Sequence, residues 1–137
     1  MRIVYVDTGA WIALLWVRDR AHRSLADHVR RIAKDSLLVT SEPAVAETAT
    51  RLRYDSGLAA TLAFHRYVEE ATRLGKLRIR ETDAALRRQA FAIMERHADL
   101  TLSYADCVGA AVASEVRASA VLGLDNDFRV LGFTLEP

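Results

Sequence analysis

The sequence opens with a short apolar run, Ile3-Val4-Tyr5-Val6, which is followed at once by Asp7-Thr8 and by the apolar stretch 10–15. An unbroken run of β-branched and aromatic residues is typical of a strand that is buried on both faces. Thr8 is a residue type that caps helices, so we expect a helix to follow over 10–15. A buried strand that leads directly into a helix is typical of an α/β fold.

The rest of the chain alternates in the same way between short apolar segments and longer helical ones. We expect further strands at 37–39, 77–80, 120–122 and 133–135, with the strand at 77–80 at an edge of the sheet. We expect helices at 21–33, 58–74, 82–97 and 103–116, a helical turn at 125–131, and a helix that Thr40 or Ser41 caps and that ends near Asp55. Strands that alternate with helices form a parallel sheet covered on both faces. The sequence therefore predicts one α/β domain over residues 1–137.

The composition excludes several classes of protein. The chain has 19 basic and 18 acidic residues, a net charge of +1, so it does not bind polyanions by bulk charge alone. Its single cysteine, Cys107, rules out an internal disulfide and favours a reducing compartment. Asp7 interrupts the first apolar run too early for a signal peptide, and no stretch has the apolar length of a membrane span. We therefore expect a cytoplasmic protein without a membrane partner.

Acidic residues follow two strands of the predicted sheet. Asp7 comes directly after the first strand, and Asp125 comes shortly after the strand at 120–122. The carboxyl ends of parallel strands meet at one edge of the sheet, where α/β proteins bind their ligands. Aspartate is also common in loops and at helix starts, and for Asp125 alone that ordinary role is the better explanation.

Asp106 is the only charged residue in the apolar stretch Tyr104–Ala113. A helix that is apolar on nearly all sides is buried, and a buried carboxylate is costly unless it is paired or bound to a metal ion. Ser103 and Asp106 also have the spacing of a capping box, which would explain the acid without any function. The two roles are compatible, because the start of this helix faces the same edge of the sheet, and we favour the functional one.

Glu47 belongs to the helix that follows the second strand. Glu47 and Arg51 are four residues apart, a spacing that favours an exposed ion pair on the helix surface. The apolar face of this helix, formed by Val45, Ala49 and Leu52, points away from Glu47. Periodicity alone therefore favours a surface role for Glu47 and does not direct it towards a site.

The four acids would repel one another if they converged from their separate elements. A divalent cation removes that conflict, and ligands that are all oxygen favour Mg²⁺ or Mn²⁺ over zinc. One or two such ions activate water and stabilise a leaving oxygen at phosphorus. Convergence of these acids would therefore indicate metal-dependent chemistry on a phosphate ester.

Four short segments carry a resemblance to a known family: Val4–Thr8, Ser41–Glu47, Leu102–Asp106 and Leu124–Phe128. In this order and at this spacing, the whole chain resembles PIN-domain ribonucleases, and in particular the VapC-type toxins of bacterial toxin–antitoxin pairs. The resemblance implies a PIN-like three-layer sandwich, and an endoribonuclease that depends on Mg²⁺ or Mn²⁺. It also implies a homodimer and a small inhibitory antitoxin as partner.

The resemblance also implies roles for individual residues. It assigns the metal-binding carboxylate quartet to Asp7, Glu47, Asp106 and Asp125. Thr8 and Ser103 match the small hydroxyl residues that support this quartet, and Asp127 matches an additional acid near it. Many relatives carry Thr or Ser two residues before the fourth acid, where this chain has Gly123, so Asp125 and Asp127 both remain candidates for the fourth ligand.

Arginines near the predicted edge are candidate contacts for the phosphates of single-stranded RNA. These are Arg18, Arg20, Arg23 and Arg51, although each taken alone fits a solvated surface arginine. The alternative function is a catalytically silent PIN-like module that binds RNA or protein. Binding of Mg²⁺ or Mn²⁺ would distinguish the two.

Overall fold

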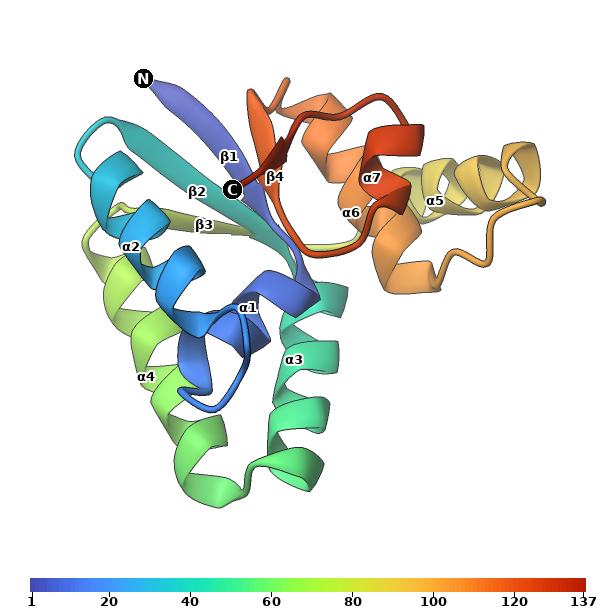
Figure 1. Ribbon diagram of the computed structural model, residues 1–137. Coiled ribbons are helices and arrows are strands. Elements are labelled where there is room, and N and C mark those ends of the chain that lie inside the picture. The colour runs from blue at the N-terminus through green and yellow to red at the C-terminus, as the bar shows by residue number, and fades with distance from the viewer.

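A computed structural model describes residues 1–137 and shows one five-stranded sheet with helices on both faces (Figure 1). The strands are β1 (Arg2–Val6), β2 (Ser36–Ser41), β3 (Leu77–Arg80), β4 (Ala120–Leu122) and β5 (Leu135–Glu136). All pairings are parallel, in the order β3-β2-β1-β4-β5, so the predicted α/β fold and the edge position of β3 are confirmed. Because β1 is the central strand, Asp7 follows it in the middle of the carboxyl edge.

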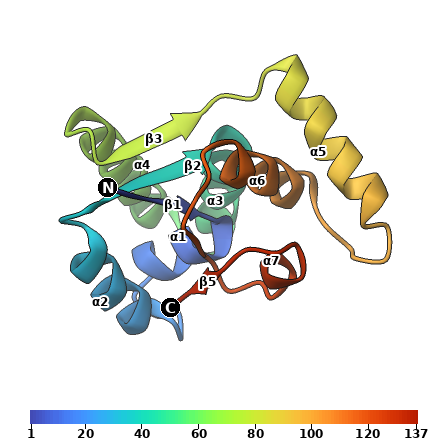
Figure 2. The same cartoon turned by 90° about the horizontal axis from the view of Figure 1, so that it is seen from above.

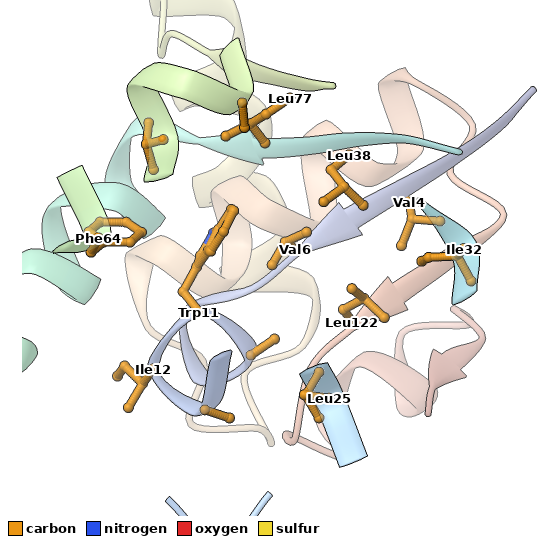
Figure 3. Close-up of a cluster of buried hydrophobic side chains, with 14 of the residues drawn as sticks. Val4, Val6, Trp11, Ile12, Leu25, Ile32, Leu38, Phe64, Leu77 and Leu122 are labelled. Atoms are coloured by element: carbon orange, nitrogen blue, oxygen red, sulfur yellow. The ribbon is translucent and has the colours of Figure 1, made fainter. Parts of the chain in front are cut away.

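Four helices form the layer on one face of the sheet: α1 (Thr8–Leu15), α2 (His22–Ile32), α3 (Glu42–Asp55) and α4 (Leu58–Arg73). Trp11 of α1 is fully buried in this layer and packs edge to face against Phe64 of α4, with 5.6 Å between the ring centroids. Figure 3 shows Trp11 between Phe64 on one side and Val6 of the sheet on the other. Burial of a large apolar side chain contributes about 3 kcal/mol, so these contacts hold α1 firmly against β1.

The opposite layer contains α5 (Ala84–Arg96), α6 (Tyr104–Glu115) and the single turn α7 (Asp127–Val130). α6 packs directly on β1 and β2, and α5 packs on α6 farther from the sheet (Figure 2). A Cβ atom at Gly109 would lie 2.7 Å from Oη of Tyr5, which is too close for any side chain. Glycine at this position therefore allows α6 to approach β1.

The two layers enclose the sheet, which confirms the three-layer sandwich. Val4 and Val6 point into one hydrophobic cluster, whereas Tyr5 points into the other. This alternation follows from the two-residue period of a strand whose faces are both covered. None of the helices combines the length and the apolar character that a membrane crossing requires.

Several predicted helix ends differ from the structure. Thr8 is the first residue of α1 and not its cap, because Asp7 occupies the N-cap position and makes no side-chain capping bond. Ser41 rather than Thr40 caps α3, where its Oγ accepts a hydrogen bond from the amide of Ala44 at 3.2 Å. The last strand lies at Leu135–Glu136 and not at 133–135, because Phe133 packs against Phe128 before the chain joins the sheet.

Candidate active site

A polar pocket of about 400 Å³ lies at the carboxyl edge of the sheet, where β1 and β4 end. Its walls come from the β1–α1 junction, from α3, from the start of α6 and from the loop after β4. The lining includes Asp7, Thr8, Glu47, Arg51, Ser103, Asp106 and Asp125. The fold thus brings together four acids that are far apart in the sequence.

Asp7 is the most buried acid of this pocket, with a relative exposure of 4%. Its backbone is fixed on both sides, because its amide donates to the carbonyl of Leu122 at 3.0 Å and its carbonyl accepts from the amide of Trp11 at 3.1 Å. The side-chain atom Oδ1 is buried and has no hydrogen-bond partner, and the same is true of Oγ1 of Thr8. Unsatisfied buried oxygens cost stability, so these two neighbours are poorly explained by a purely structural role.

Burial, followed by the nearby charge of Asp106 and the weaker ones of Glu47 and Asp125, raises the pKa of Asp7 to about 7. Both causes disfavour the ionised form. A carboxyl that is held partly protonated at neutral pH, inside a pocket of further acids, is characteristic of functional sites.

Asp106 forms the capping box that its sequence context suggested, and it also lines the pocket. Its amide donates to Oγ of Ser103 at 3.0 Å, and its Oδ2 accepts from the amide of Ser103 at 2.9 Å, which completes a capping box at the start of α6. The box fixes the orientation of the carboxylate while the side chain still lines the pocket.

Asp125 and Asp127 lie together after β4 but differ in position. Asp125 lines the pocket, is exposed, and accepts a hydrogen bond from the amide of Asp127 at 2.9 Å. Asp127 lies outside the pocket wall, although burial and the charges of Asp125 and Asp106 raise the pKa of its carboxyl. The pocket wall therefore includes Asp125 and not Asp127.

Glu47 is the acid that helical periodicity placed wrongly. The buried positions of α3 are Ala44, Thr48 and Leu52, so the helix is rotated relative to the expected apolar stripe and Glu47 lines the pocket. Arg51 lies in the same wall, but none of its guanidinium nitrogens is within 4.0 Å of a carboxylate oxygen of Glu47. The expected ion pair between the two residues is therefore absent. α3 packs against α1, α4 and α6, so its rotation follows from these tertiary contacts and not from its own apolar stripe.

Of the four candidate RNA-binding arginines, only Arg51 lines the pocket. Arg18, Arg20 and Arg23 are exposed residues in or just after the loop that follows α1. They do not belong to the pocket wall.

A hydrogen-bonded brace behind the pocket was not found from the sequence. The indole Nε1 of Trp11 donates to Oγ1 of Thr40 at 3.0 Å, and that hydroxyl donates to the carbonyl of Val6 at 2.7 Å. All three groups are buried, and the brace ties α1 and β2 to the residue that precedes Asp7. In the sequence, Trp11 is one residue of the apolar stretch 10–15 and Thr40 is a candidate helix cap, so no local pattern could have revealed the brace.

The donor set of the pocket consists of oxygen atoms, and the unpartnered Oδ1 of Asp7 provides one ligand that no protein group satisfies. Hard divalent cations such as Mg²⁺ prefer such ligands. No three His, Cys, Asp or Glu side chains are close enough together to hold a metal ion as they stand. Coordination by three of these acids would therefore require side-chain rotations within the pocket.

The largest apolar cavity, of about 590 Å³, lies elsewhere, between α2, α4 and the beginning of β2. Its lining includes Val29, Leu38, Tyr67 and Leu74 and none of the four acids. Its chemistry suits apolar contacts and not phosphate hydrolysis, so we assign the candidate active site to the smaller polar pocket.

Comparison with known proteins identifies the family. The sequence matches the PIN domain family over residues 4–134. The chain belongs to the PIN domain family. The resemblance drawn from four short segments is thereby confirmed, and the match extends over nearly all of this PIN domain. A search of curated protein sequences finds no match.

Three solved structures are similar to this PIN domain over nearly its whole length. The crystal structure of VapC20 from Mycobacterium tuberculosis, a sarcin-ricin loop cleaving toxin, has a TM-score of 0.80 and 27% identity over 96% of each chain. VapBC2 from Rickettsia felis, bound to a DNA fragment from their promoter, has a TM-score of 0.70 and 15% identity over 98% of this chain and 97% of that chain. FitAcB from Neisseria gonorrhoeae has a TM-score of 0.63 and 18% identity over 98% and 96%. The latter two similarities concern the fold alone.

Proposed function

We propose that this PIN domain is a metal-dependent endoribonuclease that hydrolyses RNA phosphodiester bonds and acts as the toxin of a toxin–antitoxin pair. The observation that carries the proposal is the pocket that Asp7, Glu47, Asp106 and Asp125 line together, in which the buried Oδ1 of Asp7 has no hydrogen-bond partner. The similarity to VapC20, a toxin that cleaves an RNA loop, supports the same activity.

The proposed cofactor is Mg²⁺ or Mn²⁺, with Asp7, Asp106, Asp125 and Glu47 as the residues that would hold it. When bound, such an ion polarises the phosphate and lowers the pKa of water. Thr8 and Ser103 support the quartet, because Thr8 has an unpartnered hydroxyl beside Asp7 and Ser103 orients Asp106. Asp127, which lies outside the pocket wall, is the additional acid near the quartet and the alternative to Asp125 as its fourth ligand.

The chain's own residues contribute position and charge to the reaction. The backbone bonds of Asp7 and the capping box of Asp106 hold two carboxylates in place before substrate arrives. Glu47 orients the attacking water and accepts its proton, since it lines the pocket without an ion-pair partner. Arg51 provides the one cation of the wall and contacts a non-bridging phosphate oxygen. Such preorganised groups typically contribute about a hundredfold or more to a rate.

The proposed partners are RNA, a small antitoxin protein and a second copy of this chain, and the proposed location is the cytoplasm. The antitoxin follows from the family resemblance, and the similarity to the toxin VapC20 supports it. The homodimer follows from the family resemblance.

Cleavage of defined RNA with mapping of the new ends, with and without Mn²⁺, tests the proposal. The wild-type protein should cut only with the metal, and Asp106→Asn should not cut. If the wild-type protein neither cuts RNA nor binds Mn²⁺ or Mg²⁺ in a calorimetric titration, the silent binding module is the correct function.

A further inference from the structure

An aromatic pair lies on the outer side of the α5–α6 layer, next to the start of α6. The rings of Phe91 from α5 and Tyr104 from α6 pack with 5.4 Å between their centroids and an angle of 34° between their planes. Phe91 is 51% exposed and Tyr104 is half-buried, so the pair is open to solvent on one side. Single exposed apolar residues are common, but a packed and exposed pair of rings provides a surface for stacking.

The pair is close to the proposed active site through the chain itself. Tyr104 directly follows Ser103, which lines the pocket, and it precedes Asp106 by two residues. Because consecutive Cα atoms are about 3.8 Å apart, the aromatic surface begins one residue away from the pocket wall. A strand whose phosphate occupies the pocket needs only a short continuation to reach it.

Positive charge accompanies the aromatic surface. Arg87 and Arg88 precede Phe91 by one helical turn, so they share its side of α5. Both are exposed, and neither forms an ion pair within 4.0 Å. Glu95 lies one turn beyond Phe91 on the same side of α5, so on this side the positive charge lies N-terminal to the ring. Arginine beside stacked aromatics is the combination with which proteins bind single-stranded nucleic acid.

We propose that Phe91 and Tyr104 form a stacking platform for an unpaired RNA base that neighbours the cleaved phosphate, with Arg87 and Arg88 contacting the adjoining backbone. The inference rests on the proposed nuclease function and adds a base-binding subsite to it. The unpaired arginines favour a nucleic acid over an apolar protein partner, because a protein interface of this kind would bury two uncompensated charges.

Binding of single-stranded RNA to full-length variants tests the platform. Each protein carries Asp106→Asn to prevent cleavage, and the probes are short fluorescein-labelled oligoadenylate and oligouridylate in Mg²⁺, measured by anisotropy. Phe91→Leu keeps an apolar helix former but removes the ring, and we expect the dissociation constant for oligoadenylate to rise about tenfold. The rise should be smaller for oligouridylate, because uracil stacks less strongly, and Phe91→Trp should restore binding.

Matched variants separate stacking from other effects. Tyr67→Leu removes an aromatic ring from α4, in the layer on the other face of the sheet, and should leave RNA binding unchanged. Substitution of Arg87 and Arg88 by Gln should weaken both oligonucleotides alike and reduce the salt dependence of binding. Circular dichroism confirms that each variant is folded.

The outcomes distinguish this inference from the proposed function. If the parent protein binds RNA and Phe91→Leu binds equally well, the platform is wrong and the nuclease proposal stands. If Phe91→Leu instead changes the oligomeric state with RNA binding unaltered, the rings form a contact between copies of the chain and the platform is overturned. If RNA cleavage by the otherwise wild-type protein fails while binding still depends on Phe91, the platform is supported and the nuclease proposal is wrong.

Discussion

Two carboxylates of the sheet have opposite surroundings. Glu136 of β5 accepts hydrogen bonds from Arg2 and from His28, each at 2.8 Å. Partial burial would raise the pKa of Glu136, but the bonds from Arg2 and His28 outweigh it and lower that pKa. Asp7, after the central strand, has an unpartnered oxygen, and burial and neighbouring acids raise its pKa to about 7.

The difference shows which acid the fold needs and which one it tolerates. The pairs of Glu136 join α2 and β1 to the C-terminal strand, so its charge stabilises the structure. The charge of Asp7 has no such compensation, and the folded state is destabilised by it above neutral pH. Proteins retain costly groups of this kind mainly at functional sites.

The largest expected effect is on catalysis. Asp7→Asn preserves the shape of the side chain but removes its charge, and we expect metal-dependent RNA cleavage to fall by about a hundredfold or more. Glu136→Gln is the matched control and should cleave at the wild-type rate. The measurement is single-turnover cleavage of a defined RNA. Equal rates for Asp7→Asn and wild type would remove the functional distinction between the two acids.

The next effect concerns stability against pH. The folded-state pKa of Asp7 is raised, so the folded protein binds more protons than the unfolded chain between about pH 4 and pH 7. Stability should therefore fall as the pH rises through this window, by up to about 4 kcal/mol if the whole shift is expressed. Urea unfolding in EDTA, at about pH 5 and about pH 8, should show a steeper loss for wild type than for Asp7→Asn. If the stability of the two proteins changed equally with pH, the charge of Asp7 would not destabilise the folded state.

Glu136 should show the opposite dependence. Its pKa is lowered in the folded state, so its contribution is present above its unfolded pKa and is lost as the pH falls through the folded value. Glu136→Gln should cost about 1 kcal/mol at neutral pH, since the pair is partly exposed, and nothing at strongly acid pH. Thermal unfolding at low and high salt measures this, because screening should reduce the difference. A cost that persists in acid would indicate a packing role for Glu136.

The last expected effect, no larger than that of Glu136→Gln, is at Gly123. A Cβ atom there would lie 3.5 Å from Cβ of Asp7 and 3.5 Å from Cδ1 of Leu135, which is ordinary van der Waals contact. Gly123→Ser should therefore fold normally and bring a hydroxyl beside Asp7, with a gain of about 1 kcal/mol at alkaline pH. Urea unfolding of Gly123→Ser and Gly123→Ala separates the effect of the hydroxyl on stability from the effect of the added Cβ carbon. An equal response of the two variants would show that the hydroxyl does not reach the carboxylate.

Three acids of the site could be predicted from the sequence, and two of them lie at strand ends. Asp7 and Asp125 follow neighbouring parallel strands, so topology alone brings them to one edge. Asp106 was recognisable because it is a lone charge in an apolar helix, and its capping box is present as well.

The remaining parts depend on tertiary packing. The rotation of α3 that places Glu47 in the pocket wall follows from packing against α1, α4 and α6, and local periodicity does not contain these contacts. The brace from Trp11 through Thr40 joins residues 29 positions apart, and only the folded chain reveals it. The choice between Asp125 and Asp127 likewise depends on the shape of a short loop.

A calorimetric titration of Mn²⁺ into the protein tests the central claim most directly, because it measures whether the acids around Asp7 form a cation site. Wild type and Glu136→Gln should bind Mn²⁺ with the same affinity, and Asp7→Asn should show no measurable binding. Failure of the wild-type protein to bind, or undiminished binding by Asp7→Asn, would contradict the account.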